Sequence, residues 1–423
     1  MRQIVDVFDD CPQPIASAKR AYQASLKLGN TKGVERSRAV LAMAQALQDS
    51  FDDILEANTL DLEASRDMAV PELVLDWLKL TPQRLGATVD ILQKLAELSD
   101  PLRRVRNADY QLEDSQTYSQ LTPLGVIAFI HEAFPDLAAL AAGLCIKTGN
   151  SIILKGSTEA SHSNVAIGNA LQAAVDHVGL PNGSLELLTA EHGTSIRDLV
   201  TQDEYLNLVI PYGRSSLIQQ VVRQATAPVL KSSIGNCYLY WSPNASLEMV
   251  RWMIMDSHQS EPDAVNAIEK VLIHRQALPS SLSVLWNTLK EKGFEIRGDE
   301  ELVEAFPQLQ LVQSKEWGSA YLTRTVAFKL VDSLEAAIAW VNQHSSGHAD
   351  CIVTESYQES RQFALGVNSA SSYINASPRF SRNPSRGDSV FLGMSNQKGL
   401  RRGLISLESL TTVKHIVQGN GRF

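Results

Sequence analysis

The sequence predicts an α/β protein with more than one domain, and two observations lead to this prediction. The chain has 423 residues, which is more than one hydrophobic core usually organises. From residue 126 onward, apolar runs of strand length alternate with amphipathic helical segments. Parallel sheets that are covered by helices on both faces have this pattern. We therefore expect a doubly wound, Rossmann-type sheet of the nucleotide-binding kind, followed by a second α/β domain.

The segment from Pro14 to Leu98 is predicted to be mainly helical. Apolar residues between Arg36 and Leu55 recur close to the 3.6-residue helical period, and a second helical piece spans Glu72 to Leu80. Thr81 followed by Pro82 predicts an N-cap with proline in the first helical turn. An apolar stripe then continues to Leu98.

The first α/β series supplies the strands of the predicted nucleotide-binding domain. Its expected strands are Val126–Ile130, Ser151–Lys155, Leu185–Leu188, Leu206–Ile210 and Pro228–Lys231. Helices are expected over Asp136–Thr148 and Ser163–Val178, and Gly179 is the predicted C-cap of the second.

A second α/β series begins near Ala245. We expect its strands at Lys270–His274, Phe294–Arg297, Leu309–Leu311, Val326–Val331 and Asp350–Val353. We expect its helices at Leu247–His258, Leu278–Lys292, Ser333–His344 and Ser356–Val367.

Two segments have a different character. Residues 111–123 are polar, and we expect them to form two short strands of the kind that pair with the sheet edge of another subunit. Residues 391–423 are expected to form loops and a closing segment. The predicted organisation is therefore a nucleotide-binding domain at 1–110 and 124–244, a catalytic-type domain at 245–390, and oligomerisation strands with the closing segment at 111–123 and 391–423.

Composition and charge exclude several classes of protein. The net charge is −9 with scattered basic residues, which argues against a nucleic-acid partner. The longest nearly apolar run, Leu137–Ile146, is about half of the roughly 20 residues that a membrane span needs. The segment from Met1 to Ala18 resembles neither a signal nor a transit peptide. Four widely spaced cysteines without a CxxC pair predict neither a disulfide framework nor a zinc site. We expect a cytoplasmic protein without a metal.

The strongest functional signal is a resemblance that extends over almost the whole chain. It is carried by GVIAFIHEAFPDLAALAAGLCIKTGNSIILKG (Gly125–Gly156), LNLVIPYGR (Leu206–Arg214), INASPRF (Ile374–Phe380) and SNQKGLRRG (Ser395–Gly403). These segments resemble γ-glutamyl phosphate reductases, also called glutamate-5-semialdehyde dehydrogenases, of the aldehyde dehydrogenase superfamily. The resemblance implies an aldehyde dehydrogenase-like fold with a small oligomerisation extension and assembly into a dimer or tetramer.

The activity implied by the resemblance is the reduction of L-glutamyl 5-phosphate by NADPH in proline synthesis. In that family a cysteine thiolate attacks the acyl phosphate, a thioester forms, and hydride transfer releases the aldehyde.

The position that corresponds to this cysteine holds a valine. The family motif Pro-Ser-x-Cys-Asn-x-x-Glu reads PDAVNAIE here, so Asn266 and Glu269 match and Val265 takes the place of the cysteine. An isopropyl group has no lone pair and cannot form a thioester. Cys237 and Cys351 are distant in sequence, and buried apolar roles are expected for Cys145 and Cys237.

Other motifs of the family depart from its pattern as well. Glu-Ala-Arg-Pro has Phe134 at the arginine, and Ile-Pro-Arg-Gly-Gly has Tyr212 and Arg214 around Gly213. Gly-x-Gly-x-Cys-His ends in Tyr238, and Gly-Leu-Gly-Ala-Glu ends in Phe391. The segments that normally meet substrate and cofactor have therefore diverged together.

The candidate cofactor residues are Lys155, Gly156 and Ser157, with Gly213 as a weaker member. In the superfamily, a lysine at this strand end contacts the adenosine ribose or its 2′-phosphate, so retained NADP binding is one hypothesis. The alternative is that Lys155 is solvated at a strand end, with Tyr212 and Arg214 partly filling the groove.

Three functional hypotheses follow. The first is a family member that has lost reductase activity and serves as a binding, regulatory or structural protein, with a protein partner still to be identified. The second is an active NADPH-dependent glutamate-5-semialdehyde dehydrogenase. The third is a different enzyme built in the same cleft.

Overall fold

The computed structural model describes residues 13–107, 115–189, 195–277, 282–399, 401–419 and 421. It divides into two compact units. The first comprises Met1–Lys231, Arg382–Leu392 and Leu404–Phe423, and the second comprises Ser232–Ser381 and Gly393–Gly403. No helix in the described ranges is long and apolar enough to cross a membrane.

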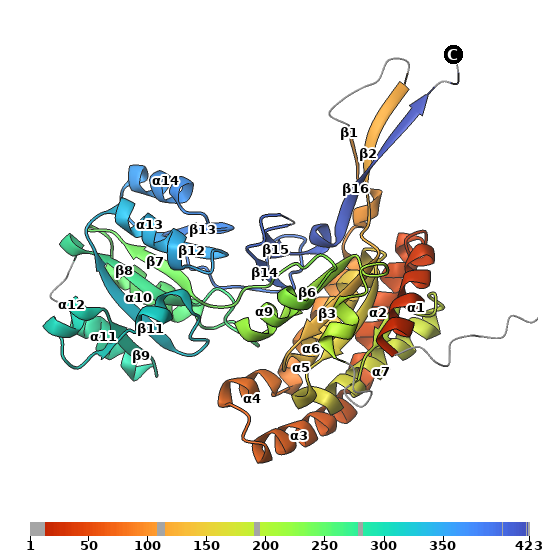
Figure 1. Cartoon of the computed structure of the whole chain (residues 1–423), viewed down its shortest axis with the longest axis horizontal. Coiled ribbons are helices and arrows are strands. Elements are labelled where there is room, and N and C mark those ends of the chain that lie inside the picture. The colour runs from red at the N-terminus through yellow and green to blue at the C-terminus, as the bar shows by residue number, and fades with distance from the viewer. Residues whose placement is uncertain are drawn as a thin grey trace, which may run out of the picture. The chain divides into compact units, whose positions relative to one another are not determined.

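The first unit begins with helices, as predicted (Figure 1). They are α1 (Gln13–Leu28), α2 (Gly33–Asp49), α3 (Phe51–Asp67), α4 (Glu72–Leu78) and α5 (Pro82–Glu97). The single helix expected from Arg36 to Leu55 is instead divided at Ser50, whose backbone N–H returns to the carbonyls of Ala46 and Leu47. The predicted N-cap is confirmed, because the Thr81 side chain accepts a hydrogen bond from the backbone N–H of Arg84.

A four-stranded parallel sheet forms the centre of the first unit, with strand order β5-β4-β3-β6. Its strands are β3 (Val126–His131), β4 (Ser151–Gly156), β5 (Leu185–Leu187) and β6 (Leu208–Tyr212). The helices that connect and flank them are α6 (Pro135–Lys147), α7 (Ser161–Val178), α8 (Ile196–Val200) and α9 (Ser215–Gln224). Gly179 ends α7 in a left-handed conformation, as predicted. The fifth expected strand, 228–231, is reduced to one bridge between Val209 and Val229.

The order of these strands creates a topological switch point. The chain moves from β3 outward to β4 and β5, and then returns to place β6 on the other side of β3. Loops that leave the carboxyl ends of β3 and β6 therefore diverge in opposite directions. Crevices at such points are common ligand sites in open parallel sheets.

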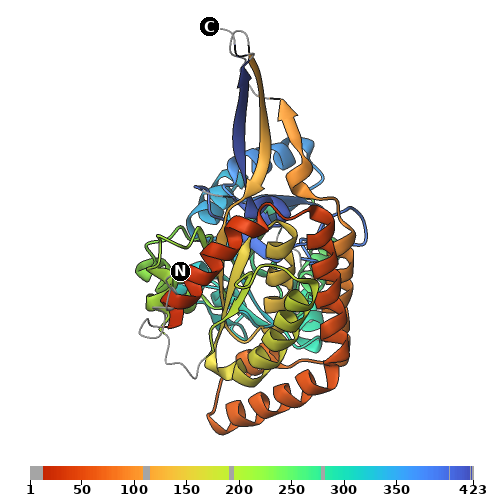
Figure 2. The same ribbon diagram turned by 90° about the vertical axis from the view of Figure 1, so that its right-hand side faces the viewer.

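A separate antiparallel sheet of the first unit joins distant parts of the chain. It has the order β1-β2-β16 and contains β1 (Val105–Asn107), β2 (Ser115–Pro123) and β16 (Thr411–Gly419). Strands β2 and β16 pair over nine residues and project beyond the helices of the unit (Figure 2). Two short strands were expected over residues 111–123, but a single strand runs from Ser115 to Pro123, while residues 111–114 lie outside the described residues.

The second unit contains a seven-stranded sheet of order β10-β9-β11-β8-β7-β12-β13, in which neighbouring strands run parallel. Its strands are β7 (Cys237–Trp241), β8 (Ile268–His274), β9 (Glu295–Gly298), β10 (Gln310–Leu311), β11 (Thr325–Val331), β12 (Ala349–Val353) and β13 (Ser371–Ile374). Its helices are α10 (Leu247–Ser257), α11 (Leu282–Glu291), α12 (Glu300–Ala305), α13 (Leu334–His344) and α14 (Tyr357–Gly366). The four residues before α11, which were expected to open that helix, lie outside the described residues. The short strand β14 (Gly393–Ser395) also belongs to this unit, whereas β15 (Gly403–Ile405) lies mostly in the first unit.

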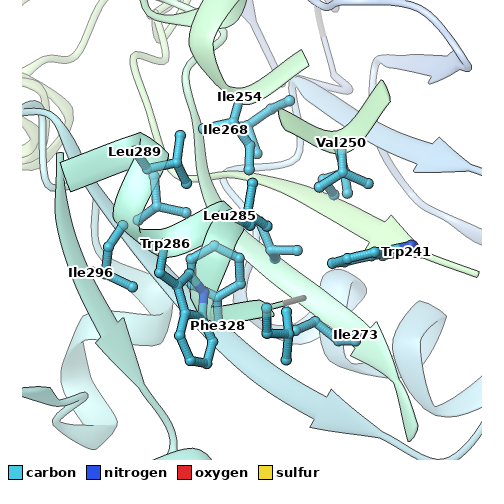
Figure 3. Close-up of a cluster of buried hydrophobic side chains, with 14 of the residues drawn as sticks. Trp241, Val250, Ile254, Ile268, Ile273, Leu285, Trp286, Leu289, Ile296 and Phe328 are labelled. Carbon is cyan, nitrogen blue, oxygen red and sulfur yellow. The ribbon is translucent and has the colours of Figure 1, made fainter. Parts of the chain in front are cut away.

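One face of this sheet packs against α10 and α11 through a large apolar cluster (Figure 3). Trp286 lies at its centre, with its ring edge-on to the ring of Phe328 at a centroid distance of 5.7 Å. Trp241 from β7 belongs to the same cluster. Burial of such aromatic side chains contributes most to the cohesion of a core.

The domain boundaries differ from the expected ones in two places. Residues 237–241 fell within the expected nucleotide-binding domain (124–244) and no strand was predicted there, but they form β7, which pairs with β8 and β12 in the second unit. Residues Arg382–Leu392 were expected in the catalytic-type domain, but they belong to the first unit. Both differences arise from tertiary pairing, because a short apolar strand such as β7 can join either sheet.

Candidate functional site

A pocket of about 360 Å³ lies in the first unit at the carboxyl ends of β3 and β4 and the start of α9. Its lining residues are Val74, Ile130, His131, Glu132, Lys155, Gly156, Ser157, Thr158, Glu159, Ile196, Arg214, Ser216, Leu217 and Gln220. The position corresponds to the switch point of the sheet, where parallel α/β sheets bind ligands.

Three of the predicted cofactor residues line this pocket. Lys155 is largely buried at the end of β4, and burial lowers the pKa of its ammonium group. Gly156 packs against Asn164 so closely that an added Cβ would lie 2.0 Å from the Asn164 amide nitrogen. The hydroxyl of Ser157 is buried and has no hydrogen-bond partner within the described ranges. The structure thus brings Lys155, Gly156 and Ser157 together.

Gly213, the fourth predicted residue, shapes the wall of the pocket without lining it. Its φ is +147°, and a Cβ added there would lie 2.5 Å from the carboxylate of Glu132, so the position leaves no room for a side chain. The next residue, Arg214, donates from its backbone N–H to Glu132 Oε2 at 2.6 Å and from Nε to Oε1 at 3.0 Å. The tight turn after β6 therefore clamps Glu132 at the end of β3.

The Glu132–Arg214 pair was not predicted from the sequence. The strand register could have indicated this pair, because β3 and β6 are neighbouring parallel strands and His131 is in register with Tyr212. Residues that follow paired strand ends are close in space. The adjacent imidazole of His131 contacts the carbonyl of Glu132 at 2.9 Å, and burial lowers its pKa to about 4, so the ring is neutral at pH 7.

The pocket residues fit the phosphate-bearing part of a nucleotide. Lys155 supplies positive charge, and the unpartnered Ser157 hydroxyl can donate to an oxygen. Ser216 and Leu217 belong to the first turn of α9, where backbone N–H groups favour an anion. The volume lies within the usual range of small-molecule sites. Glu132 and Glu159 also line the pocket, and Glu132 is neutralised by its pair with Arg214.

Two of the departures from the family motifs contact each other. The rings of Phe134 and Tyr212 meet edge-on at a centroid distance of 5.3 Å, and Trp77 lies against Phe134 at 4.6 Å. Both Phe134 and Tyr212 are completely buried, and the Tyr212 hydroxyl accepts a hydrogen bond from Arg382 at 2.7 Å. Tyr212 was expected to fill part of the groove, but it packs instead in a buried aromatic cluster.

Val265 lies in the second unit, in the segment between α10 and β8, and is completely buried. Its carbonyl oxygen accepts hydrogen bonds from the Gly235 backbone N–H and from His348 Nε2, both at 2.9 Å. The backbone at this position is therefore fixed from two sides. The side chain offers only methyl groups.

Glu269, expected at the degenerate catalytic motif, is a structural anchor in this conformation. Its carboxylate is fully buried and accepts hydrogen bonds from the backbone N–H groups of Asn236, Tyr321 and Leu322 at 2.8–2.9 Å. Asn236 and Leu322 have positive φ angles of 55° and 59°, which are unfavourable for residues with side chains. Lys270 Nζ lies 3.9 Å from the same carboxylate.

Asn266, the third motif residue, is also held by the scaffold. Its amide nitrogen donates to the carbonyl of Pro378 at 2.8 Å, while its side-chain oxygen is buried without a partner in the described part of the chain. Val265, Asn266 and Glu269 thus sit in one rigid, buried segment.

A buried thiol lies near Val265. Cys237 Sγ is 3.4 Å from His348 Nε2, and His348 Nδ1 is 2.9 Å from the Ser346 hydroxyl. Burial raises the pKa of Cys237 well above its usual value and lowers that of His348 to about 4. Neither group is exposed, so the pair lacks both the thiolate and the access that a nucleophile needs.

The described residues contain no cluster of metal-ligating side chains. Within those ranges, no group of three or more His, Cys, Asp or Glu residues is placed to hold a metal ion.

Comparison with known proteins identifies the family of this chain. Residues 9–235 match the model of the aldehyde dehydrogenase family, and these are more than half of the chain. The chain belongs to that family. It is 55% identical over 403 residues to gamma-glutamyl phosphate reductase 2 of Synechocystis sp. (strain ATCC 27184 / PCC 6803 / Kazusa), covering 95% of this chain and 96% of the relative. It is 39% identical over 406 residues to gamma-glutamyl phosphate reductase of Gloeobacter violaceus, covering 96% and 97%.

Solved structures give the same result for the fold. The crystal structure of gamma-glutamyl phosphate reductase from Thermotoga maritima matches with a TM-score of 0.86 and 30% identity, over 97% of this chain and 99% of that one. An acetylating aldehyde dehydrogenase from Geobacillus thermoglucosidasius matches with a TM-score of 0.67 at 13% identity, over 97% of each chain. The predicted aldehyde dehydrogenase-like α/β fold and the resemblance to γ-glutamyl phosphate reductases are therefore confirmed.

Proposed function

We propose that this protein is a homologue of γ-glutamyl phosphate reductases that binds NADP(H) in the pocket of its first unit but has lost the family's thioester-forming reduction. The proposal is supported by the buried Val265, which the match of Asn266 and Glu269 to the family motif would align with the nucleophilic cysteine. Reduction through a thioester needs a sulfur nucleophile, and a valine side chain supplies none.

Cofactor binding is supported by the pocket at the switch point. Members of the aldehyde dehydrogenase family use NAD or NADP, and the bound cofactor would supply or accept a hydride. Lys155 and Ser157 would hold the ribose or its phosphate, and Arg214 would orient Glu132 at the pocket wall. Gly156 leaves the space that Asn164 occupies beside Lys155 and Ser157.

Loss of the reduction is supported by more than one position. The cations expected at the positions of Phe134 and Tyr212 are replaced by aromatic rings that pack on each other. Cys237 offers no substitute sulfur, because it is buried and its pKa is raised well above its usual value. A binding or regulatory role, with a protein partner still to be identified, follows from these changes.

The second candidate function is an active γ-glutamyl phosphate reductase. It is favoured by the 55% identity to a relative of that name and by coverage of nearly the full length of both chains. This candidate requires a nucleophile other than the side chain at position 265. A cytoplasmic location belongs to both candidates, because the described cysteines, Cys145, Cys237 and Cys351, are free thiols.

One experiment separates the two candidates. We expect NADPH fluorescence titration to show binding by the full chain, and Lys155→Gln to weaken it by about tenfold through loss of a charge-assisted hydrogen bond. Lys27→Gln, a substitution of an exposed lysine outside the pocket, is the matched control. The same protein should show no phosphate-dependent reduction of NADP⁺ with glutamate 5-semialdehyde.

The outcomes are distinct. Robust turnover by the unaltered protein would sink the proposal of lost reduction and favour the second candidate. If NADPH fails to bind, or binds equally well to the Lys155→Gln variant, the assigned cofactor pocket is wrong. A gain of turnover in Val265→Cys would show that the rest of the reductive site is retained.

A further inference from the structure

Two adjoining pockets lie in the second unit, along the end of α10, the end of α11 and the segment before β11. One has a volume of about 240 Å³ and the other about 310 Å³. The smaller is lined by Met255, His258, Gln259, Lys292, Phe294 and Arg324. The larger shares Met255, Gln259 and Lys292 with it and adds Arg251, Trp252, Asp256 and Thr288. The three shared residues make the two pockets one continuous groove, which we call the α10–α11 groove.

The smaller end of the groove carries only positive charge. Lys292 and Arg324 both line it, and no carboxylate does. Arg324 Nη1 donates to the backbone carbonyl of Lys292 at 3.2 Å, which holds the guanidinium beside the lysine. Within the described ranges, neither cation forms an ion pair with a carboxylate. Two like charges at one concave site favour a bound anion, because each repels the other until an anion is present.

Apart from the shared Lys292, the charged residues of the larger end are already paired. Asp256 pairs with Arg379 at 3.4 Å, and Arg251 pairs with Glu248. The positive charge that remains is therefore concentrated at Lys292 and Arg324. Because Arg324 lines only the smaller end, the positive charge of the groove decreases toward Trp252.

The floor between the two cations is neutral and aromatic. His258 places its ring edge-on to Phe294 at a centroid distance of 4.9 Å, and its Nδ1 contacts the carbonyl of Ile254 at 2.9 Å. Its Nε2 is buried and has no hydrogen-bond partner among the described residues. Burial, together with the charge of Arg324, lowers the pKa of His258 to about 4. The imidazole is therefore neutral at pH 7 and adds no further positive charge to the groove.

The larger end of the groove presents an apolar surface. Trp252 is 49% exposed, which is unusual for an indole in a helix that otherwise faces a core. Met255, between Trp252 and the cations, lines both pockets. Exposed tryptophan beside cationic residues is typical of surfaces that bind a ligand with both an apolar and an anionic part.

We propose that the α10–α11 groove binds a small organic anion, with Lys292 and Arg324 holding its phosphate or carboxylate group and Trp252 covering its apolar body. This site is separate from the nucleotide pocket of the first unit and does not depend on it. It also adjoins the segment that contains Val265. Gln259 is the first residue after His258, and the Ser257 hydroxyl at the end of α10 accepts a hydrogen bond from the Ile268 backbone N–H at 3.1 Å.

The test uses phenyl phosphate as the probe and the full chain, with binding followed by isothermal titration calorimetry. Phenyl phosphate should bind, and benzoate should bind as a carboxylate analogue, whereas benzyl alcohol should not. The Lys292→Gln, Arg324→Gln double variant should bind phenyl phosphate at least tenfold more weakly. Lys290→Gln, an exposed lysine of α11 outside the groove, should bind like the unaltered chain.

Further measurements test where on the protein phenyl phosphate binds. Raising the salt concentration should weaken binding, because the cations are exposed to solvent. Trp252→Ala should weaken phenyl phosphate at least threefold and leave inorganic phosphate unchanged. Lys155→Gln, which alters the nucleotide pocket, should bind phenyl phosphate normally.

Three results would overturn the proposal. One is the absence of phenyl phosphate binding at millimolar concentration, and another is equal affinity in the Lys292→Gln, Arg324→Gln variant. A loss of binding in Lys155→Gln would place the probe in the first unit instead. Equal affinity for phenyl phosphate and inorganic phosphate would refute the role of Trp252. Lys155 is buried, whereas the other variants change exposed side chains, and the thermal unfolding midpoints of all four variants check that folding is retained.

Discussion

At the scale of single residues, Glu269 illustrates how an inherited motif residue acquires its meaning from its contacts. Its match to the family motif suggested a place in a catalytic segment, but its carboxylate holds three backbone N–H groups. Two of these belong to Asn236 and Leu322, which have left-handed backbones. Lys270 lies above the Tyr321 ring with Nζ 3.5 Å from the centroid, and burial lowers its pKa to about 8. The pair Glu269–Lys270 therefore joins three separate segments of the second unit.

Removal of this carboxylate should loosen the segments that it joins. We expect Glu269→Ala to reduce the free energy of unfolding of the second unit by about 3–5 kcal/mol, because it leaves buried N–H groups and a buried ammonium unpaired. Native-state hydrogen exchange should show lost protection at the amides of Asn236, Tyr321 and Leu322. The exposed Glu355→Ala substitution is the charge-matched control.

Exchange at those three amides that is unchanged in Glu269→Ala would contradict the anchoring role. A loss of protection that extended equally to β3 and β4 of the first unit would point to global unfolding instead.

At the scale of elements, a buried carboxylate from α3 caps α7. Asp61 accepts hydrogen bonds from the backbone N–H groups of His162 at 3.0 Å and Ser163 at 2.7 Å. Its oxygen also lies 2.9 Å from His162 Nδ1. Free N–H groups at a helix start attract negative charge, so this carboxylate occupies the position that an anionic ligand would otherwise take. In the proposed cofactor pocket, the start of α9 would therefore be the helix terminus that meets a phosphate.

Loss of the cap should destabilise α7 and the helices packed on it. We expect Asp61→Ala to lower the free energy of unfolding of the first unit by about 1–3 kcal/mol, since two N–H groups lose a buried acceptor. Urea unfolding followed by circular dichroism measures the change. Glu63→Ala, from an exposed position in the same helix, should have an effect within about 0.5 kcal/mol. Equal effects of the two substitutions would refute the capping role.

At the scale of the whole molecule, the β1-β2-β16 sheet is the feature that suggests assembly. Strand β16 lies at an edge of this sheet, and an exposed strand edge is a surface that can pair with another chain. Val413 and Val417 are 42% and 46% exposed, and their spacing of four residues places them on one face of the strand. Aldehyde dehydrogenase family members are often oligomeric.

We therefore expect a dimer or tetramer that depends on this sheet. Val413→Asp combined with Val417→Asp should shift the protein toward monomer in sedimentation-velocity measurements, because charged groups replace apolar contact area. Lys414→Asp changes a neighbouring residue on the opposite face of β16 and serves as the control. A chain that is monomeric before substitution would show that the predicted oligomerisation role is wrong.

Much of the fold could be predicted because local signals were strong. The apolar runs that became β3 and β4 are buried along nearly their whole length, and Gly179 ends α7 for a local steric reason. Strand β7 and the division at Ser50 were missed, because neither has a local sequence signal that outweighs the tertiary contacts. The Lys155–Gly156–Ser157 group was predicted as a unit, since its members are adjacent in sequence.

The sequence by itself determined the family, the strand–helix order, and the absence of a sulfur atom at position 265, because these depend on residue identity and spacing. Only the tertiary structure decided which buried groups face one another. It placed the Glu132 carboxylate against Arg214, the carboxylate of Glu269 against three backbone N–H groups, and the cations of Lys292 and Arg324 in one groove. These partners are separated by tens of residues, and the parallel strand pairing and helix packing that bring them together are long-range interactions.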